Sequence, residues 1–264
     1  MRLIDEGIDV EWNRGGGGIV SWTRKHEVNV DTSVQNNPTV DAELIPGVEV
    51  WSIFKRKKGT YCRDGNPIVH ALKHEFGWKF KTENDERAVK RQFNKIAEKF
   101  VREHKHEIVI LVPYSNRLNN YIVDVILRKE PDCDYMEGFA KKLTTEEVFD
   151  AVVDGNNSFT RKYANDYEER LNELVMYLKN MDKHHNGIFV RHEIKNEEMR
   201  NVLDRTLKMS DAVQAMDANK INGADLLIID NTISRGQTIK EMVKPIQTSY
   251  SPKSITVLTL FSRI

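Results

Sequence analysis

The sequence predicts an α/β protein built on a parallel sheet with helices on its faces. Three short runs are rich in β-branched residues and lack polar alternation, which is typical of strands buried on both faces of a parallel sheet. These runs are EIVILVP (Glu107–Pro113), ADLLIID (Ala224–Asp230) and SITVLTLF (Ser254–Phe261). Helical patterns separate the runs from about residue 107 onward, and this alternation favours a parallel sheet. We therefore expect an α/β core over residues 106–264.

Residues 1–105 are expected to form an N-terminal segment and hood. A short helix is expected to begin near Pro67, because proline suits the first helical position. The clearest helix of the chain runs from Thr82 to Lys105. Thr82 and Asp85 have the spacing of a capping box, and apolar residues recur at helical intervals behind them. Basic residues fill the opposite face, so this is a basic amphipathic helix.

The remaining elements of the core can be placed in order along the chain. A loop and helix are expected over Tyr114–Lys129, helices over Thr144–Val153 and Ala164–Met181, a strand over Gly187–Ile194, and helices over Asn196–Leu207 and Thr238–Gln247. This order puts at least one helix between successive strands.

The charge of the chain is balanced overall but uneven along its length. The chain carries 40 Lys and Arg against 40 Asp and Glu, whereas Trp51–Lys105 holds 15 against 7. Such a basic segment could pair with the acidic remainder of the chain or with an anionic partner. Acids interleave with bases along the helix, which favours internal pairing there. The run Lys55–Lys58 contains no acid, which favours an anionic partner such as nucleic acid.

The cysteine content and the hydropathy pattern indicate the cellular compartment of the protein and its relation to membranes. Cys62 and Cys133 are the two cysteines, and no CxxC motif is present, which suits a reducing compartment. No apolar stretch is long enough to span a bilayer, and the first residues lack the apolar core of a signal peptide. We therefore expect a cytoplasmic protein without membrane association, and an oligomer is possible.

A glycine run and a histidine pair are two weaker patterns in the N-terminal part of the chain. The run Gly15–Gly18 could bring the backbone close to a phosphate, but a flexible loop or turn explains it as well. His70 and His74 are four residues apart in a helical pattern, yet no third ligand accompanies them. No metal site built from protein ligands is therefore predicted.

The stretch LLIIDNTISRGQT (Leu226–Thr238) carries the most chemistry. A buried strand ends in Asp230, and a turn with hydroxyl groups and Gly236 then opens a helix. Ligands of open parallel sheets bind beyond the carboxyl ends of the strands. The N–H groups at the start of a helix suit a phosphate, and a carboxylate can accept hydrogen bonds from a vicinal diol. The stretch therefore predicts a site for a ribose 5-phosphate.

This stretch resembles the phosphoribosyl-diphosphate (PRPP) motif of the type I phosphoribosyltransferases. The upstream segments WSIFKRKKGTYCRDGNPIVHALKHEFGW and VILVPYSNRLNN are similar to the ComF-like branch of that family. The resemblance covers roughly residues 51–264, and its specificity lies in the thirteen residues of the motif. It implies an α/β core of the phosphoribosyltransferase type, with a hood built from residues 1–105 and 130–165 that reads the acceptor base.

The resemblance also implies roles for individual residues. Asp230 and Asn231 would hold the ribose hydroxyls, and Arg191 and Lys195 would belong to a loop that closes over the leaving group. The 5-phosphate would be bound by Thr232, Ser234, Arg235, Gly236, Gln237 and Thr238, and the diphosphate by Tyr114, Ser115, Asn116 and Arg117. Mg²⁺ would enter with PRPP, bound mainly to substrate oxygens and water.

Two positions depart from the family pattern. Asn231 replaces the second acid of the motif and so removes one negative charge, which would help to stabilise an oxocarbenium-like transition state. Arg235 stands where small residues are common, and it adds a cation beside the phosphate or points to solvent.

Three functions are compatible with these observations. The first is an enzyme that transfers a phosphoribosyl group from PRPP to a nitrogenous acceptor and releases diphosphate. The second is a regulator that senses PRPP or a nucleotide without turnover, which the neutral Asn231 and the basic segment favour. The third is a nucleotide-handling effector of a defence system that a protein or nucleic-acid partner restrains.

Overall fold

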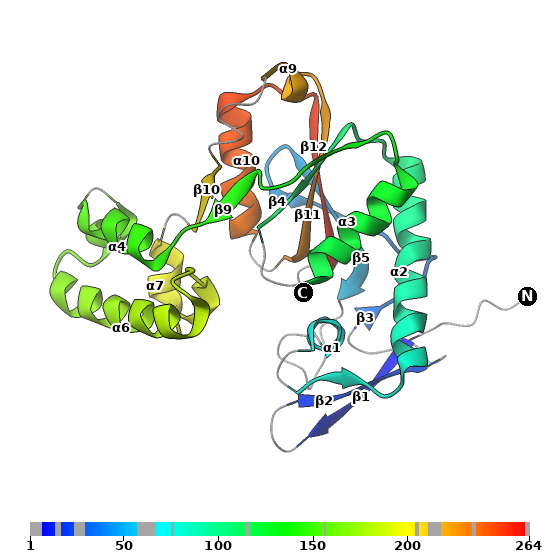
Figure 1. The fold of residues 1–264 in the computed structure, drawn as a ribbon, viewed down its shortest axis with the longest axis horizontal. Helices are drawn as coiled ribbons and strands as arrows, with labels where there is room; N and C mark the ends of the chain where they lie inside the picture. Colours follow the sequence, from blue (N-terminus) through cyan, green and yellow to red (C-terminus); the bar gives the residue numbers. More distant parts are fainter. Residues whose placement is uncertain are drawn as a thin grey trace, which may run out of the picture. The chain divides into compact units, whose positions relative to one another are not determined.

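The computed structural model describes residues 7–13, 17–23, 30–56, 67–74, 77–113, 117–155, 157–203, 206–210, 218–233 and 236–261 (Figure 1). The chain forms two compact units. The first comprises residues 1–137 and 217–264, and the second comprises residues 138–216. This division does not follow the expected one at residues 105 and 106, because a strand from the first 105 residues lies inside the main sheet. Along the sequence, the second unit lies between two segments that each contribute strands to that sheet.

The first unit is organised around a mostly parallel sheet of seven strands. Five strands run parallel in the spatial order β5 (Val48–Arg56), β12 (Ser254–Phe261), β11 (Asp225–Thr232), β7 (Ile108–Leu111) and β8 (Asp134–Met136). Two further strands, β3 (Val30–Asp31) and β4 (Thr39–Ile45), pair with β5 in antiparallel orientation. The predicted fold class, an α/β protein with a parallel sheet flanked by helices, is confirmed.

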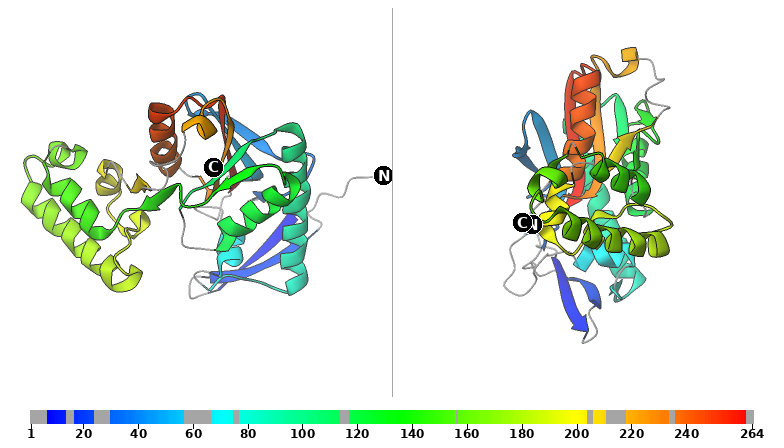
Figure 2. Two further views of the ribbon diagram at one scale, coloured as in Figure 1. Left: turned by 45° about the horizontal axis from the view of Figure 1, so that its top comes forward. Right: turned by 90° about the vertical axis from the view of Figure 1, so that its left-hand side faces the viewer.

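Helices cover both faces of this sheet (Figures 1 and 2). On one face, α2 (Glu83–Glu103) and α3 (Arg117–Lys129) share a buried core with Leu227 and Ile229 of β11. On the other face lies α10 (Gln237–Ser249), which buries Ile239, Met242, Val243 and Ile246. Because side chains alternate along a strand, Leu227, Ile229 and Asn231 face α3, whereas Ile228 and Asp230 face α10.

Helix α2 begins as its sequence predicts. Thr82 is the N-cap residue and accepts a hydrogen bond from the backbone N–H of Asp85, while the Asp85 carboxylate accepts one from the N–H of Thr82. The same carboxylate accepts a hydrogen bond of 2.7 Å from the backbone N–H of Trp22. The capping box therefore also ties the helix to the small N-terminal sheet.

The bases of α2 pair with acids of their own chain at several positions. Arg87 contacts Glu83 at 2.9 Å, Lys90 contacts Glu86 at 2.6 Å, and Glu98 contacts Lys129 of α3 at 3.3 Å. These contacts agree with the internal pairing expected for the helix. Because the groups are solvent-exposed to a substantial degree, each pair contributes about 1 kcal/mol or less.

The small N-terminal sheet comprises β1 (Gly7–Asn13), β2 (Gly17–Thr23) and β6 (Lys79–Phe80). Its second strand begins with the last two residues of the glycine run. A Cβ atom on Gly18 would lie 2.6 Å from the Trp78 ring, so only glycine fits at this position. At Gly18 the glycine run thus serves close packing, and residues 15 and 16 lie outside the described part of the chain.

The other elements of the first unit are short. Helix α1 (Pro67–Lys73) begins at Pro67, as predicted, and α9 (Ala218–Ile221) precedes β11.

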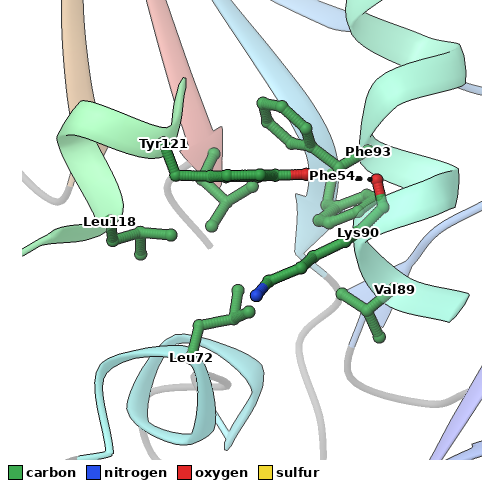
Figure 3. A pocket seen from close by; sticks show the side chains of 8 residues that line it. Phe54, Leu72, Val89, Lys90, Phe93, Leu118 and Tyr121 are labelled. Carbon is green, nitrogen blue, oxygen red and sulfur yellow. Dashed lines mark hydrogen bonds between the residues drawn. The ribbon is translucent and has the colours of Figure 1, made fainter. Parts of the chain in front are cut away.

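The first unit also contains a cavity of about 10 Å³. Lys90 lies in the wall of this cavity, and the amine of Lys90 is directed toward Leu72 (Figure 3). The lining residues are Phe54, Leu72, Val89, Lys90, Phe93, Leu118, Tyr121 and Leu260. A volume of this size admits a single water molecule at most, so the cavity is not a ligand site.

The second unit is mainly helical. It contains α4 (Thr145–Val153), α5 (Ser158–Lys162), α6 (Tyr167–His185), the 3₁₀ helix η1 (Arg191–Glu193) and α7 (Glu197–Val202), with β9 (Ala140–Lys142) antiparallel to β10 (Leu207–Met209). Its core includes Phe159, Leu174, Met181 and Phe189, all of them buried. The strands β9 and β10 bring the beginning and the end of this unit together.

The predicted strand over Gly187–Ile194 is wrong. Only Ile188 forms a bridge, to Thr144, and the 3₁₀ helix follows from Arg191. Phe189 and Ile194 are buried in the helical core of the unit. A short apolar run is compatible with a strand or with another buried segment, and here no neighbouring strand extends the single bridge. The helix predicted over Asn196–Leu207 is confirmed only for Glu197–Val202.

The carboxylate of Asp225, at the amino end of β11, predicts a dependence of stability on pH. The Asp225 carboxylate accepts hydrogen bonds of 2.6 Å from Lys253 and from Ser254, the first residue of β12. The hydrogen bond from Lys253, which has the largest effect, and the one from Ser254 lower the pKa of Asp225 below its usual value. A lowered folded pKa stabilises the fold above the unfolded pKa of about 3.9, and this contribution is lost as the pH falls through the folded pKa.

We therefore expect Asp225→Asn to lower the free energy of unfolding by about 1 kcal/mol at pH 7, because the pair is partly exposed. The difference from the unmodified chain should shrink as the pH falls below about 4. Urea unfolding at pH 7 and at pH 3 measures both quantities. An equal difference in the free energy of unfolding at the two pH values would contradict the role given to the Asp225 hydrogen bonds.

Candidate functional site

The strands β7 and β11 form a topological switch point. They are parallel neighbours, and the backbone N–H of Val112 donates to the carbonyl oxygen of Ile229 at 3.0 Å. After β7 the chain continues into α3 and then to β8, whereas after β11 it continues into α10 and then to β12 (Figure 1). The two helices lie on opposite faces of the sheet. In open α/β sheets, the carboxyl ends of two such strands are the usual place for a ligand.

Asp230 and Asn231 lie at the carboxyl end of β11 and face opposite sides of the sheet. Asp230 is 5% exposed and Asn231 is fully buried. The Asp230 carboxylate accepts a hydrogen bond of 2.7 Å from the backbone N–H of Asn231. The amide oxygen of Asn231 accepts one of 2.9 Å from the hydroxyl of Thr232. The two residues that the motif pairs therefore stand in different environments.

The start of α10 has the features expected of an anion site. Gly236 is the N-cap residue with a φ of 71°, and no side chain caps the helix among the described residues. The first turn contains no acid, and its N–H groups have no partner within the helix. Gln237 is exposed and Thr238 is half-buried. Ser234 and Arg235 lie outside the residues that the structure describes.

Gly236 also packs closely against the β4 strand. A Cβ atom added to it would lie 3.3 Å from Cγ of Leu44. The left-handed backbone and this close approach both favour glycine. The position predicted for Gly236 from the sequence, in a turn that opens a helix, is confirmed.

A row of buried polar side chains crosses the sheet on the face of α10. Asp230 is in register with Thr259 of β12, and Thr259 is in register with Ser52 of β5. Register partners in parallel strands point to the same face, so the three side chains line up on the face of α10. Thr259 is fully buried and Ser52 is 2% exposed. Sequence reasoning missed this row, because it assigned no role to Ser52 or Thr259.

A second polar feature lies on the face of α3. Asn119, in the first turn of α3, is 1% exposed, and neither its amide nitrogen nor its amide oxygen has a hydrogen-bond partner within the described residues. The amide nitrogen of Asn231 also lacks one there. Sequence reasoning missed Asn119 as well, although it lies two residues beyond the predicted diphosphate loop.

The predicted diphosphate loop is described only at its end. Tyr114, Ser115 and Asn116 lie outside the described residues, and Arg117 begins α3. Their role in binding diphosphate stays a prediction. Of the predicted anionic-partner run Lys55–Lys58, Lys55 is exposed, whereas residues 57 and 58 lie outside the description. The partner also stays a prediction.

Arg191 and Lys195 belong to the second unit. The Arg191 guanidinium donates a hydrogen bond of 3.0 Å through Nε to the backbone oxygen of Arg200, so it supports the end of α7. Lys195 is exposed beyond η1. A structural role therefore accounts for Arg191, and the proposed closure over a leaving group stays a prediction.

The second unit also contains an open groove that the sequence did not indicate. Its volume is about 580 Å³, and it lies between α4 and α6. Phe149, Val175 and Leu178 form its apolar part, and Glu146, Lys179 and Asp182 add charges of both signs. The groove thus has the size of a ligand site but no charge of one sign to select a ligand.

The cysteine and the histidine pair that the sequence raised show no sign of a reactive or metal-binding site where the structure describes them. Burial raises the pKa of Cys133 to about 12, so its thiol is protonated and unreactive near neutral pH. His74 lies beyond the end of α1 with a φ of 55°, so it does not share a helical face with His70. Within the described ranges, no three His, Cys, Asp or Glu residues are placed to hold a metal ion. The magnesium that would accompany PRPP stays a prediction.

Comparison with known proteins adds no family assignment. No protein-family model matches the chain, and no curated protein sequence matches it. In the part of the chain that the structure describes, none of the helices combines the length and apolar character that crossing a bilayer requires.

Proposed function

We propose that the carboxyl ends of β7 and β11 bind PRPP and that the chain transfers its phosphoribosyl group to a nitrogenous acceptor. In this reaction the bond between C1 of the ribose and the diphosphate oxygen breaks, and a bond from C1 to the acceptor nitrogen forms. Diphosphate leaves with the electron pair, and the acceptor nitrogen loses its proton to solvent or a base. Mg²⁺ bound to the diphosphate would neutralise charge on the leaving group.

One observation carries this proposal. Asp230 is buried near the carboxyl end of β11 at a topological switch point, and a left-handed Gly236 then starts a helix that no described side chain caps. The carboxylate suits the hydroxyls of a ribose, and the helix start suits a phosphate. These two groups are separated by five residues in the chain, from 231 to 235, which suits the two ends of one sugar phosphate.

The chemistry of Asn231 favours a second candidate function. Asn231 is neutral and fully buried, so Asp230 alone supplies negative charge at the end of β11. A single carboxylate stabilises a developing oxocarbenium cation less than two do. A regulator that binds PRPP or a nucleotide without turnover would need only the binding groups.

Calorimetry and product detection together test both functions. Ribose 5-phosphate and PRPP with Mg²⁺ are titrated into the protein, and diphosphate and new nucleotides are then sought after incubation with PRPP, Mg²⁺ and a pool of nucleobases. Binding with diphosphate release in the presence of a base supports the enzyme. Binding without release supports the regulator. Absence of binding to both sugar phosphates contradicts the site itself.

A further inference from the structure

Two buried asparagines leave amide groups unpaired on one side of the candidate site. Both amide atoms of Asn119 and the amide nitrogen of Asn231 lack hydrogen-bond partners within the described ranges. Asn119 is 1% exposed and Asn231 is fully buried. Burying a donor or acceptor without a partner destabilises a fold, and native structures contain few such groups. Three of them in two residues of one region therefore require an explanation.

The two asparagines lie on the same face of the sheet and at the same edge. Asn231 follows Leu227 and Ile229 in the alternation of β11, and these two residues share a core with Leu118 and Ile122 of α3. Asn119 is next to Leu118 in the first turn of α3 and is buried like it. That turn follows the carboxyl end of β7, the parallel neighbour of β11. Both amides are thus placed at the switch point, on the side opposite Asp230.

The unpaired atoms define the chemistry of a partner. The two amide nitrogens donate, whereas the amide oxygen of Asn119 accepts. A partner that only accepts hydrogen bonds, such as a fully ionised phosphate, would leave the oxygen of Asn119 unpaired. A hydroxyl group both donates and accepts, so a sugar hydroxyl satisfies the set.

We propose that Asn119, on the same face of the sheet as Asn231, joins Asn231 in recognising a ribose hydroxyl of the bound sugar phosphate. This inference rests on the proposed function, in which Asp230 and the start of α10 hold the same ligand. It assigns to Asn119 a part in sugar specificity, while the phosphate is held elsewhere.

The test compares ribose 5-phosphate with ethyl phosphate, which has the phosphate but no sugar hydroxyl. Their affinities are measured by calorimetry for the unmodified chain, for Asn119→Leu and for Asn119→Ala, together with the melting temperature of each ligand-free protein. The unmodified chain should prefer ribose 5-phosphate, and both variants should lose about tenfold of that preference. Their affinity for ethyl phosphate should stay unchanged. Asn119→Leu should melt at a higher temperature, because an unpaired polar group is replaced by an apolar one of similar shape.

Asn94→Leu is the matched control on the neighbouring helix. Asn94 has a partner, since its amide oxygen accepts a hydrogen bond of 3.1 Å from the Tyr121 hydroxyl. Its replacement should lower the melting temperature and leave both affinities unchanged. If Asn119→Leu instead lowers the melting temperature as Asn94→Leu does, or if the preference for ribose 5-phosphate survives in both Asn119 variants, the inference is overturned.

Failure of this inference can be told apart from failure of the proposed function. If the unmodified chain binds ribose 5-phosphate and ethyl phosphate equally, the recognition of a hydroxyl is overturned while the phosphate site stands. If it binds neither compound, both the inference and the proposed site are overturned.

Discussion

Replacing Gly236 with valine is expected to abolish the binding of ribose 5-phosphate and PRPP. Gly236 has a φ of 71°, and a β-branched residue adopts this backbone conformation only with strain. A Cβ atom would also lie 3.3 Å from Cγ of Leu44. The start of α10 would have to move, and the N–H groups that are proposed to meet the phosphate would move with it. Calorimetry with both ligands measures the loss, which should exceed about tenfold if binding depends on these groups.

Gly223→Val is the control for the backbone strain alone. Gly223 has a φ of 78°, lies before the amino end of β11, and has open space around the position of a Cβ atom. Both variants should lose about 1–2 kcal/mol of stability, the cost of a left-handed conformation for a residue other than glycine. Only Gly236→Val should lose affinity. Unchanged affinity in Gly236→Val, or an equal loss in the two variants, would rule out the phosphate site at α10.

Asp230→Asn is expected to reduce phosphoribosyl transfer from PRPP by about 10²- to 10³-fold, if the chain is an enzyme. The carboxylate is 5% exposed, and in such an environment a charge acts strongly on a developing cation. The asparagine would retain an oxygen that accepts the hydrogen bond from the N–H of Asn231, so the fold should persist. The initial rate of diphosphate release measures the effect, and circular dichroism confirms the fold.

The matched control is Asp225→Asn, at the other end of the same strand. It removes an identical charge from β11 and disturbs the hydrogen bonds to Lys253 and Ser254 instead. Its turnover should equal that of the unmodified chain, whereas its stability should fall. Equal turnover in Asp230→Asn would mean that the carboxylate serves the fold or a different reaction.

The local features of the site could be predicted because they depend on neighbouring residues. The buried strand that carries Asp230, the capping box of α2 and the glycine that opens α10 all follow from short patterns, although β11 continues two residues past the acid, to Thr232. The predictions were wrong or incomplete where a short segment has no strong pattern of its own. The expected strand over Gly187–Ile194 is one example, and the unpredicted hairpin of β4 with β5 is another.

The sequence by itself determined the α/β class, the order of the central strands and the presence of polar residues at the carboxyl end of β11. The longer apolar runs, which turn residues bound, indicated the buried strands β7, β11 and β12 without reference to their neighbours. The stretch Leu226–Thr238 therefore indicated a sugar phosphate from its residues alone.

Only the tertiary structure decided which strands are neighbours and which polar side chains meet. Strand pairing joins β5 to β12 across most of the chain, and it places β7 beside β11 with their helices on opposite faces. The row of Ser52, Thr259 and Asp230, and the position of Asn119 on the face of Asn231, follow from this pairing. No local pattern predicts which distant residues share a face, because hydrophobic burial fixes the register between distant strands only when the whole core is assembled.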